Sequence, residues 1–327
     1  MAHQGIMEEQ ARGLAVDAVV PLLLLAGGAL LWWAAAFHVS ALPVWAPWDF
    51  SWLWYLAASL TSWWYIRGLI LSPGKERPPV WRIVSFGLGM VLIWAVLQTR
   101  YEYLAEHMFF LNRIQHLVMH HLGPFLIALA WPGAAIMRGM PEPVRRFLRL
   151  RGFAVALRIV QQPVLAAFLF VGLIALWLTP PVHFRAMVDP TLYAFMNWTM
   201  VGDGVLFWTL VLDPRPKPPA FCSFGARAAV SVAIIIPQIV IGAVIAFAGR
   251  DIYAFYTWCG RIFPSIGAVD DQIYGGLIVW IPASMMSLVG LLLVINNLRL
   301  SDKEKEAADA SETEPGGIVI SSKAWTG

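Results

Sequence analysis

The sequence has little charge and almost no cysteine, and each shortage excludes a class of protein. Charged residues make up 13% of the 327 residues, about half the share that is usual in soluble domains. A soluble globule of this size would not have enough charge to cover its surface. Cys222 and Cys259 are the only cysteines, and two cysteines cannot build a disulfide framework or a zinc ribbon.

Apolar residues are abundant instead. They make up 59% of the chain, which excludes disorder over most of its length. A helix needs about 20 mostly apolar residues to cross a bilayer. We therefore predict an all-α integral membrane protein, a bundle of about eight transmembrane helices, with seven as the alternative. The runs cover residues 17–37, 51–71, 80–99, 115–137, 162–179, 191–212, 228–248 and 273–298.

The positions of lysine and arginine predict the orientation. With the N-terminus in the cytoplasm, 18 of the 23 Lys and Arg residues fall in cytoplasmic segments and 5 in outer segments, as the positive-inside rule favours. We predict a multi-pass protein of the bacterial inner (plasma) membrane with both termini cytoplasmic. The first run is interpreted as a retained span, because its flanks do not fit a cleaved signal peptide.

The same reasoning divides the chain into three parts. Residues 1–16 form a cytoplasmic N-terminal segment, 17–298 the transmembrane helical domain and 299–327 a flexible cytoplasmic tail. The basic loop at 138–161 is predicted to contain an amphipathic surface helix over residues 144–159, which at the least anchors the topology.

Histidines cluster on one side of this predicted topology. Six of the seven fall at or near the outer face, and polar groups near a membrane span often mark a functional site. The side chains concerned are His38, His107, His116, His120, His121 and His183.

The fourth run carries the strongest metal-binding pattern. In a helix, residues three and four positions apart share a face, so His116, Met119 and His120 should project together from its outer turns. Imidazole suits copper, zinc and iron, whereas a thioether selects Cu(I). The face therefore predicts a copper site, and the adjacent His121 is a further candidate ligand. The alternative is that each histidine is a hydrogen-bonded packing residue.

The sixth run adds Met196, Asn197 and Met200 at helical spacing in its outer half. These methionines are either a relay for a soft metal or flexible filler of the bundle core. Asp203 lies near the middle of the same run, where a carboxylate needs a partner, water or a proton. An Arg or a His from another helix would serve, and the sequence leaves the choice open.

Polar residues also precede the last run. Asp271 and Gln272 lie beside Asp270 just before Gly275-Gly276. A carboxylate at a helix N-terminus is favoured by capping and by the helix dipole, and paired glycines allow a close helix approach. Each of these features has a structural explanation as well as a functional one.

Three stretches resemble the polytopic CtaG family of cytochrome c oxidase assembly factors, which differs from the single-span copper chaperone of the same name. They are QHLVMHHLGPFLIALAWP at 115–132, PVHFRAMVDPTLYAFMNWTMVGDGVLFWTLVLDP at 181–214 and DDQIYGGLIVWIP at 270–282. The resemblance covers about residues 80–298 and implies a role in maturing the copper-containing oxidase. The resemblance implies functional roles for His116, His183, Asp203 and the Asp271-Gln272 motif.

One feature departs from the family pattern. The resemblance leads us to expect histidine in the outer half of the sixth run, where Met196, Asn197 and Met200 stand instead. A site made of histidine alone is therefore in doubt, and thioether ligands would shift it toward Cu(I).

The favoured function is thus a non-enzymatic assembly factor that holds Cu(I) transiently at the periplasmic face and delivers it to cytochrome c oxidase subunits. Its expected partners are these subunits and membrane lipid, and no nucleic-acid partner is expected. The expected ligands are His116, Met119, His120 and His121, joined by His183 and His38, with Met196 and Met200 as a relay and His107, Asn197, Asp203, Asp271 and Gln272 in supporting roles.

Three alternatives remain open. A haem protein would pair His116 or His120 with His38 as axial ligands. A transporter would line its path with Asp203 and the spans that proline and glycine interrupt. A structural partner of the oxidase would bind no ligand.

Overall fold

The computed structural model describes the backbone of residues 2–313 and the side chains of residues 19–307. The prediction of an all-α fold is confirmed: the chain is 80% helical, and the described residues contain no strand. The helices are α1 (Ala2–Phe37), η1 (Val39–Ala41), α2 (Trp52–Ile70), η2 (Gly74–Glu76), α3 (Val80–Gln98), α4 (Tyr101–His107), α5 (Phe109–His116), η3 (Leu117–Leu122), α6 (Gly123–Ala130), α7 (Gly133–Gly139), α8 (Glu142–Leu148), α9 (Arg151–Val160), α10 (Pro163–Leu178), α11 (Pro180–Val188), α12 (Pro190–Val211), α13 (Phe224–Ala233), α14 (Ile235–Ala246), α15 (Ala254–Cys259) and α16 (Ala268–Thr313).

Four helical segments of the described chain are long and apolar enough to cross a membrane, namely Val19–Phe37, Val80–Gln98, Phe224–Ala246 and Ala268–Ala307. Two bent pairs raise the number to six. They join Phe109–Ala130 to Gly133–Gly139 at 77° and Arg151–Val160 to Pro163–Leu178 at 71°. Helices α2 and α12 coincide with the other two predicted runs but carry more polar and aromatic side chains. The count of eight stays a prediction.

The fourth predicted run differs most from the structure. Its helix begins at Phe109 rather than near residue 115, and it ends at Trp131, whose φ of 51° is left-handed. Pro132 follows, and the residue before a proline is biased away from the helical region. Because the helix starts earlier, His120 and His121 lie near its middle and not in its outer turns as predicted.

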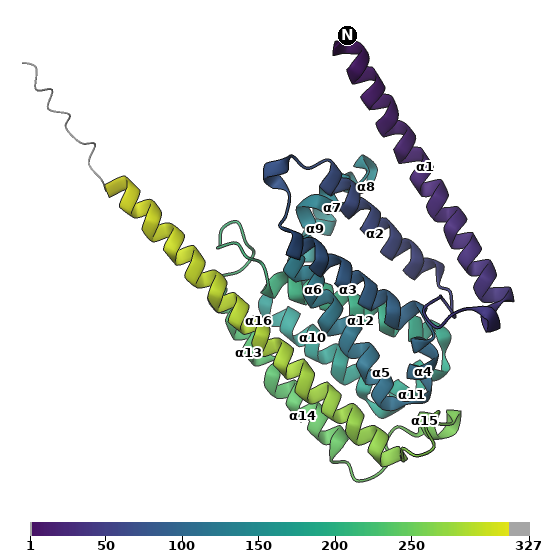
Figure 1. The fold of residues 1–327 in the computed structure, drawn as a ribbon. Helices are drawn as coiled ribbons and strands as arrows, with labels where there is room; N and C mark the ends of the chain where they lie inside the picture. Colours follow the sequence, from purple (N-terminus) through teal and green to yellow (C-terminus); the bar gives the residue numbers. More distant parts are fainter. Residues whose placement is uncertain (1, 314–327) are drawn as a thin grey trace, which may run out of the picture.

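The helices form one bundle with two long arms (Figure 1). Helix α16 lies along α14 and reaches α5, whereas α1 stands at the edge and packs on α2. The start of α1 and the end of α16 lie at the same end of the bundle, and α4, α11 and α15 lie at the opposite end. Helix α16 continues to Thr313 past the predicted tail boundary at 299, and residues 314–327 of that tail lie outside the described residues.

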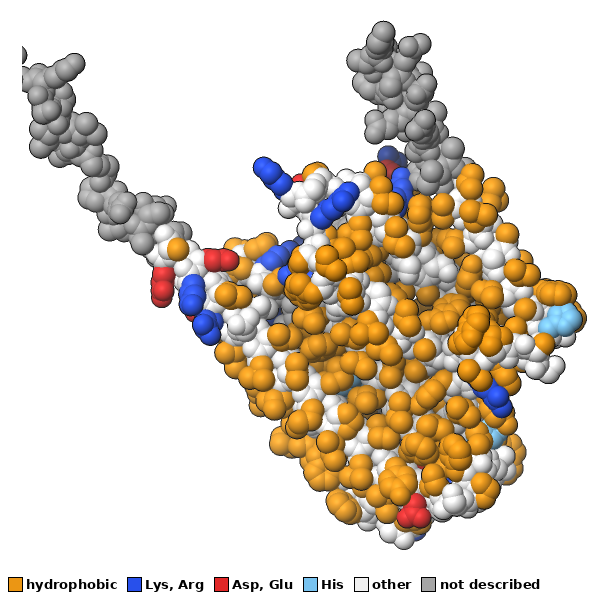
Figure 2. Space-filling model, in the orientation of Figure 1, with side chains coloured by type: hydrophobic (Ala, Val, Ile, Leu, Met, Phe, Trp, Pro, Cys, Tyr) orange, Lys and Arg blue, Asp and Glu red, His pale blue; other side chains and the backbone are white. Residues whose placement is uncertain are grey.

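Charge is distributed unevenly along the bundle. Lys and Arg side chains gather at the end where α1 begins and α16 ends, and orange apolar side chains cover the middle (Figures 1 and 2). This is the distribution that the positive-inside rule associates with a cytoplasmic end. The predicted surface helix over 144–159 forms at this end as two helices, α8 and α9, with a break at Arg149 and Leu150.

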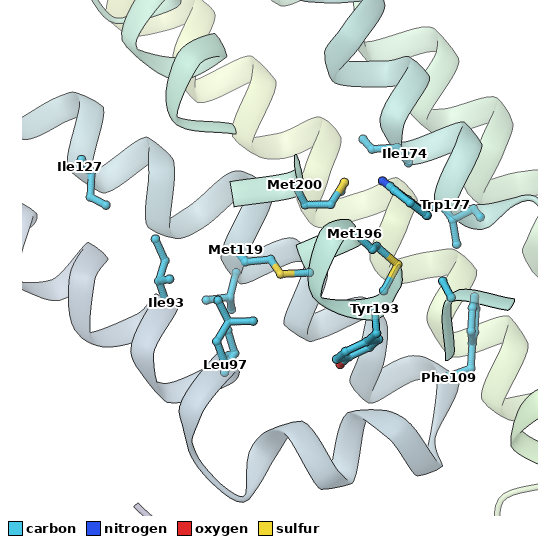
Figure 3. Packing of buried hydrophobic residues seen from close by; sticks show 14 of the residues in the cluster. Ile93, Leu97, Phe109, Met119, Ile127, Ile174, Trp177, Tyr193, Met196 and Met200 are labelled. Carbon is cyan, nitrogen blue, oxygen red and sulfur yellow. The ribbon is translucent and has the colours of Figure 1, made fainter. Parts of the chain in front are cut away.

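The core lies between α3, the α5–η3–α6 rod, α10 and α12. Met119, Met196 and Met200 pack there with Ile174 and Trp177 (Figure 3). Methionine fills irregular gaps between helices because its side chain is unbranched and polarizable. A polar site is embedded in this apolar setting, next to the methionines.

Candidate functional site

The site is built on a π-helical turn. Residues Leu117–Leu122 form η3, which lies between α5 and α6 in one rod. A π turn holds more residues than an α turn, and such turns are frequent at functional sites. The larger turn brings adjacent side chains closer in direction, and both His120 and His121 are buried, with 0% and 4% of their surface exposed.

The histidines of this rod line a small cavity of about 30 Å³. Such a volume holds about one water molecule or a single ion. The rings of His120 and His121 lie 4.9 Å apart between centroids. The cavity walls come from α5, η3, α10, α12 and α16, through Arg113, His116, Leu117, His120, His121, Ile174, Trp177, Leu178, Met200, Ile278, Val279 and Ala283.

Asp203 is the partner of His120. Its Oδ2 lies 3.0 Å from His120 Nε2, across the contact between α12 and η3. The sequence left Arg or His open as the partner, and the structure selects His. A carboxylate that holds one nitrogen of an imidazole fixes the ring and its tautomer, and leaves the other nitrogen to accept or to ligate. Phe170 stacks on the His120 ring at 4.1 Å and holds it from the other side.

His121 is held by a residue that the sequence reasoning missed. Gln238 of α14 is fully buried, and its Nε2 lies 3.2 Å from His121 Nε2. Because a side-chain amide can turn to accept as well as donate, this contact suits either ring tautomer. The signal was present in the sequence, since Gln238 is a polar residue inside an apolar run.

Several imidazole nitrogens of this group have no partner among the described residues. They are both ring nitrogens of His116, Nδ1 of His120 and Nδ1 of His121. Buried polar atoms are almost always paired in folded proteins, with protein or with bound water or ions. Unpaired nitrogens on three rings around one cavity therefore indicate that the cavity binds a water molecule, an ion or another small ligand.

Arg113 is a second residue whose role the sequence did not reveal. It was counted with an outer loop, but only 3% of its surface is exposed and it lines the cavity. It donates to Asn112 Oδ1 and lies over the ring of Phe109. The cavity wall thus carries one positive charge, and the carboxylate of Asp203 contacts the same cavity only through His120.

His183 lies elsewhere in the core. Its Nδ1 is 3.1 Å from Trp177 O and its Nε2 is 3.0 Å from Tyr256 Oη. Both ring nitrogens are therefore engaged, and the histidine does not line the cavity. This arrangement ties α11 to α10 and α15, which is the packing role weighed above.

The two remaining outer histidines are not brought to the cavity. His38 is exposed after α1, with its ring 4.5 Å from that of Trp33. His107 ends α4, and its Nδ1 lies 2.7 Å from Tyr103 O. Neither lines the cavity.

The three methionines pack in one apolar cluster (Figure 3). Of the three, Met200 also lines the cavity, whereas Met119 and Met196 do not. Met119 does not share the cavity-lining face with His116 and His120. It lies within the π turn, where residues three and four apart no longer have the angular spacing of an α-helix. Asn197 is 1% exposed and its Oδ1 has no partner among the described side chains.

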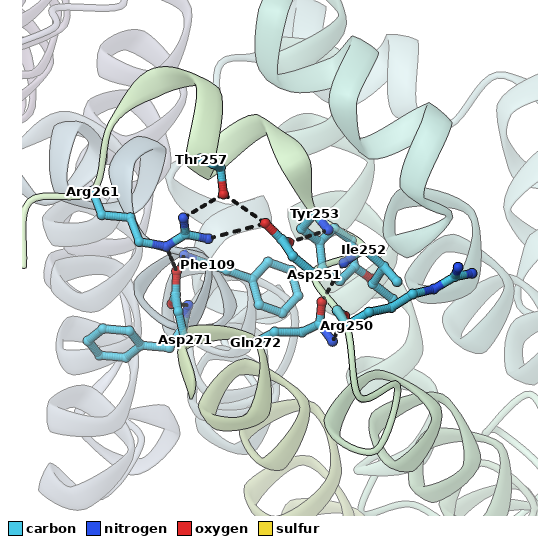
Figure 4. A network of polar contacts seen from close by, with 10 residues as sticks. Phe109, Arg250, Asp251, Ile252, Tyr253, Thr257, Arg261, Asp271 and Gln272 are labelled. Carbon is cyan, nitrogen blue, oxygen red and sulfur yellow. Dashed lines mark hydrogen bonds and ion pairs between the residues drawn. The ribbon is translucent and has the colours of Figure 1, made fainter. Parts of the chain in front are cut away.

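Asp271 and Gln272 join loops to helices at the end of the bundle that carries α15 (Figure 4). Asp271 accepts from the backbone N–H groups of Phe109 and Phe110, at 3.0 and 2.8 Å, and so caps α5 rather than its own helix. Arg261 Nε lies 3.3 Å from the same carboxylate. Gln272 donates to Ile245 O and accepts from Ile252 N–H, which fixes the loop after α14.

The donor set limits what the site can bind. Within the described chain, no three His, Cys, Asp or Glu side chains are placed to hold a metal ion. A metal in this cavity would therefore need a ligand of another type beside the imidazoles. Met200 lines the cavity and carries a thioether sulfur, and imidazole and thioether together are the type of donor set that suits copper.

A family model described as "Cytochrome c oxidase caa3 assembly factor (Caa3_CtaG)" matches residues 63–299. The chain belongs to this family. The Caa3_CtaG match includes every residue that lines the cavity, and it leaves out α1 and His38. Neither a curated protein nor a solved structure matches the chain. The family is that of assembly factors for cytochrome c oxidase, and the apolar helices agree with a membrane protein.

Proposed function

We propose that the protein holds Cu(I) in the cavity beside η3 and passes it to a cytochrome c oxidase subunit during assembly of the enzyme. The ligands are His116, His120 and Met200, with His121 as an alternative imidazole. The copper is cargo, so no catalysis is required. The proposal places the cavity toward the periplasmic side of the bacterial inner membrane, with all eight runs as spans and both termini in the cytoplasm.

The observation that carries this proposal is the set of unpaired imidazole nitrogens around a space of single-ion size. His116 is the strongest case, because both of its ring nitrogens are buried without a partner. A neutral imidazole has one donor and one acceptor. Leaving both unmet in an apolar core is costly, and a bound ion would satisfy the acceptor.

The charges around the cavity favour a weakly held monovalent cation. Arg113 contributes one positive charge and Asp203 one negative charge. Binding of Cu(I) would leave one net positive charge in a medium of low dielectric constant, where charges interact strongly. A divalent ion would leave two. The arrangement therefore supports transient holding of a monovalent ion rather than permanent storage.

The haem alternative has less support in the geometry. The histidine cavity measures about 30 Å³, whereas sites for small organic ligands take about 300–1,000 Å³. A cavity of about 450 Å³ does lie between α2, α3, α7 and α12, but its lining contains no histidine or cysteine. Met90 lines this space, so it offers one thioether but no histidine or cysteine to serve as the other axial ligand of a haem.

Copper binding by a double variant tests the proposal. The full-length protein, purified in detergent under reducing conditions, should bind about one Cu(I) per chain, since the cavity has room for one ion. His116→Ala with His120→Ala should abolish that binding while the protein stays folded and membrane-inserted.

The matched control is His38→Ala with His107→Ala, which removes two histidines outside the cavity. It should bind copper like the wild type. Unchanged stoichiometry in the His116/His120 variant, or an equal loss in the control, would refute the site.

A further inference from the structure

A second, polar cavity lies at the arginine-rich end of the molecule. It measures about 320 Å³ and sits between α9, the end of α12 and the segment that leads into α13. Its charged lining residues are Arg158, Asp213, Arg215 and Arg227. This end is separated from the histidine cavity along α12, where Met200 of the histidine cavity precedes Thr209 and Leu210 of the polar cavity.

Arg227 builds the floor of this cavity. It is 1% exposed and donates to the carbonyls of Asp213, Arg215 and Cys222. These bonds fold the segment before α13 around the guanidinium. Its Nε has no partner among the described residues, so one buried cationic donor remains unsatisfied. A charged donor left without an acceptor is costly, which indicates that the cavity receives an acceptor.

Two positive charges remain after internal pairing. Arg215 forms a two-bond pair with Asp213, at 2.9 and 2.8 Å, and lies over the Trp131 ring. This pair neutralises one arginine. Arg227 and Arg158 are left, and Arg158 makes no hydrogen bond or ion pair with any described side chain. The cavity is therefore suited to an anion.

An apolar groove continues from the cavity. It runs between α9 and α10, is lined by Val155, Ile159 and Leu165 with the polar Gln162 beside them, and shares Arg158 with the cavity. Val155 and Ile159 are about half exposed, at 46% and 57%. A cationic pocket joined to an apolar groove matches one kind of molecule, an anionic head with a hydrocarbon chain.

We infer that this region is a binding site for an anionic phospholipid, with the phosphate in the cavity at Arg158 and Arg227 and an acyl chain in the groove. Basic pockets between helices on the cytoplasmic side are suited to such headgroups. Free phosphate would satisfy the arginines but leave the groove exposed, and a zwitterionic lipid would leave the net charge uncompensated. A bound lipid would hold α9 against α10 and α12 at the membrane surface.

The test is a lipid titration of the full-length protein in uncharged detergent, read as the rise in Tm that ligand binding produces. The probes are short-chain phosphatidylglycerol, short-chain phosphatidylcholine and inorganic phosphate. We expect phosphatidylglycerol alone to raise Tm. Arg158→Gln should weaken its apparent affinity about fivefold, as expected for one basic residue at a membrane surface, and Arg158→Lys should largely restore it.

Arg151→Gln is the matched control, because Arg151 is exposed on the same helix and lines neither the cavity nor the groove. It should titrate like the wild type. The inference is overturned if phosphatidylglycerol gives no shift, if phosphatidylcholine or phosphate gives an equal one, or if Arg151→Gln loses as much affinity as Arg158→Gln. Copper binding is unaffected by any of these outcomes, so the two sites are tested separately.

Discussion

The carboxylate of Asp203 contacts His120 and so affects how this imidazole can act as a ligand. A carboxylate that faces Nε2 leaves Nδ1 of the same ring available. It also raises the basicity of the ring, and partners of this kind change metal affinity strongly when they are removed. In the proposed copper site, Asp203 would therefore act through His120, as a positioning residue.

Asp203→Asn should weaken Cu(I) binding about 10- to 100-fold, because the amide keeps the shape but removes the charge that orients His120. A competition titration with a Cu(I) chelator of known affinity measures the change. Asp189→Asn is the control on the same helix, since Asp189 caps α12 and asparagine caps equally well. Wild-type affinity in Asp203→Asn would contradict the role of the pair.

Asp271 should matter for stability and not for copper. Its carboxylate accepts from two N–H groups at the start of α5 and faces Arg261. Asp271→Ala leaves these buried groups unpaired, and we expect a loss of about 2–4 kcal/mol, seen as a lower Tm. The exposed neighbour Asp270, replaced by alanine, should change Tm little. A folded Asp271→Ala protein that has lost copper would instead make Asp271 part of the metal site.

At the scale of residues, the sequence predicted which polar side chains lie in the site better than it predicted their hydrogen-bond partners. The spacing of His116 and His120 suggested a shared face, and both line one cavity. The spacing could not show that Tyr256 and the carbonyl of Trp177 engage His183. Tyr256 lies 73 residues from His183, and Trp177 lies six residues before it at the end of the preceding helix α10. Local periodicity encodes neither the distant neighbour nor the bend between α10 and α11.

The close approach of α12 to η3 places Asp203 against His120. Gly204 makes this approach possible, because a Cβ there would meet the backbone oxygen of His120 and lie 3.0 Å from Pro124 Cγ. Small residues at such crossings let helices come close inside membranes. Gly202, on the same helix, faces open space.

Gly204→Ala should therefore lower Tm and weaken copper binding together. Pushing α12 away from η3 costs about 1–3 kcal/mol of overpacking and lengthens the contact between Asp203 and His120. Gly202→Ala should be neutral or slightly stabilising, because alanine is the better helix former. Thermal unfolding and Cu(I) titration of both variants measure these effects. Equal Tm and equal Cu(I) affinity of the two variants would contradict a helix crossing that depends on Gly204.

The sequence predicted where the helices lie but not how they bend. All eight apolar runs contain helix, yet the π turn at Leu117–Leu122 and the break at Trp131 were not foreseen. A π turn has no strong composition signal of its own, and it persists because tertiary packing holds it. The earlier start of α5 depends on a cap from Asp271, which lies 162 residues away.

The whole molecule is polarised between an arginine-rich end and an end formed by α4, α11 and α15 (Figures 1 and 2). The two cysteines fall on opposite ends, since Cys259 closes α15 and is exposed, and Cys222 is buried beside the polar cavity. The pair offers a direct test of the proposed orientation.

A membrane-impermeant maleimide should label Cys259 from outside in spheroplasts of cells that carry Cys222→Ser, and should not label Cys222 in cells that carry Cys259→Ser. Desolvation by partial burial and the carboxylate of Glu106 raise the pKa of the Cys259 thiol. The thiolate is the reactive form, so labelling should rise about tenfold per pH unit below that pKa. Labelling of Cys259 only after lysis would reverse the topology.

In the proposed site imidazole and thioether hold copper together, and X-ray absorption of the Cu(I)-loaded protein tests this most directly. We predict a first shell of nitrogen with one sulfur, and loss of the sulfur signal in Met200→Leu, while Met196→Leu keeps it because Met196 does not line the cavity. A shell without sulfur in the wild-type protein, or a sulfur signal unchanged by Met200→Leu, would contradict the proposed site.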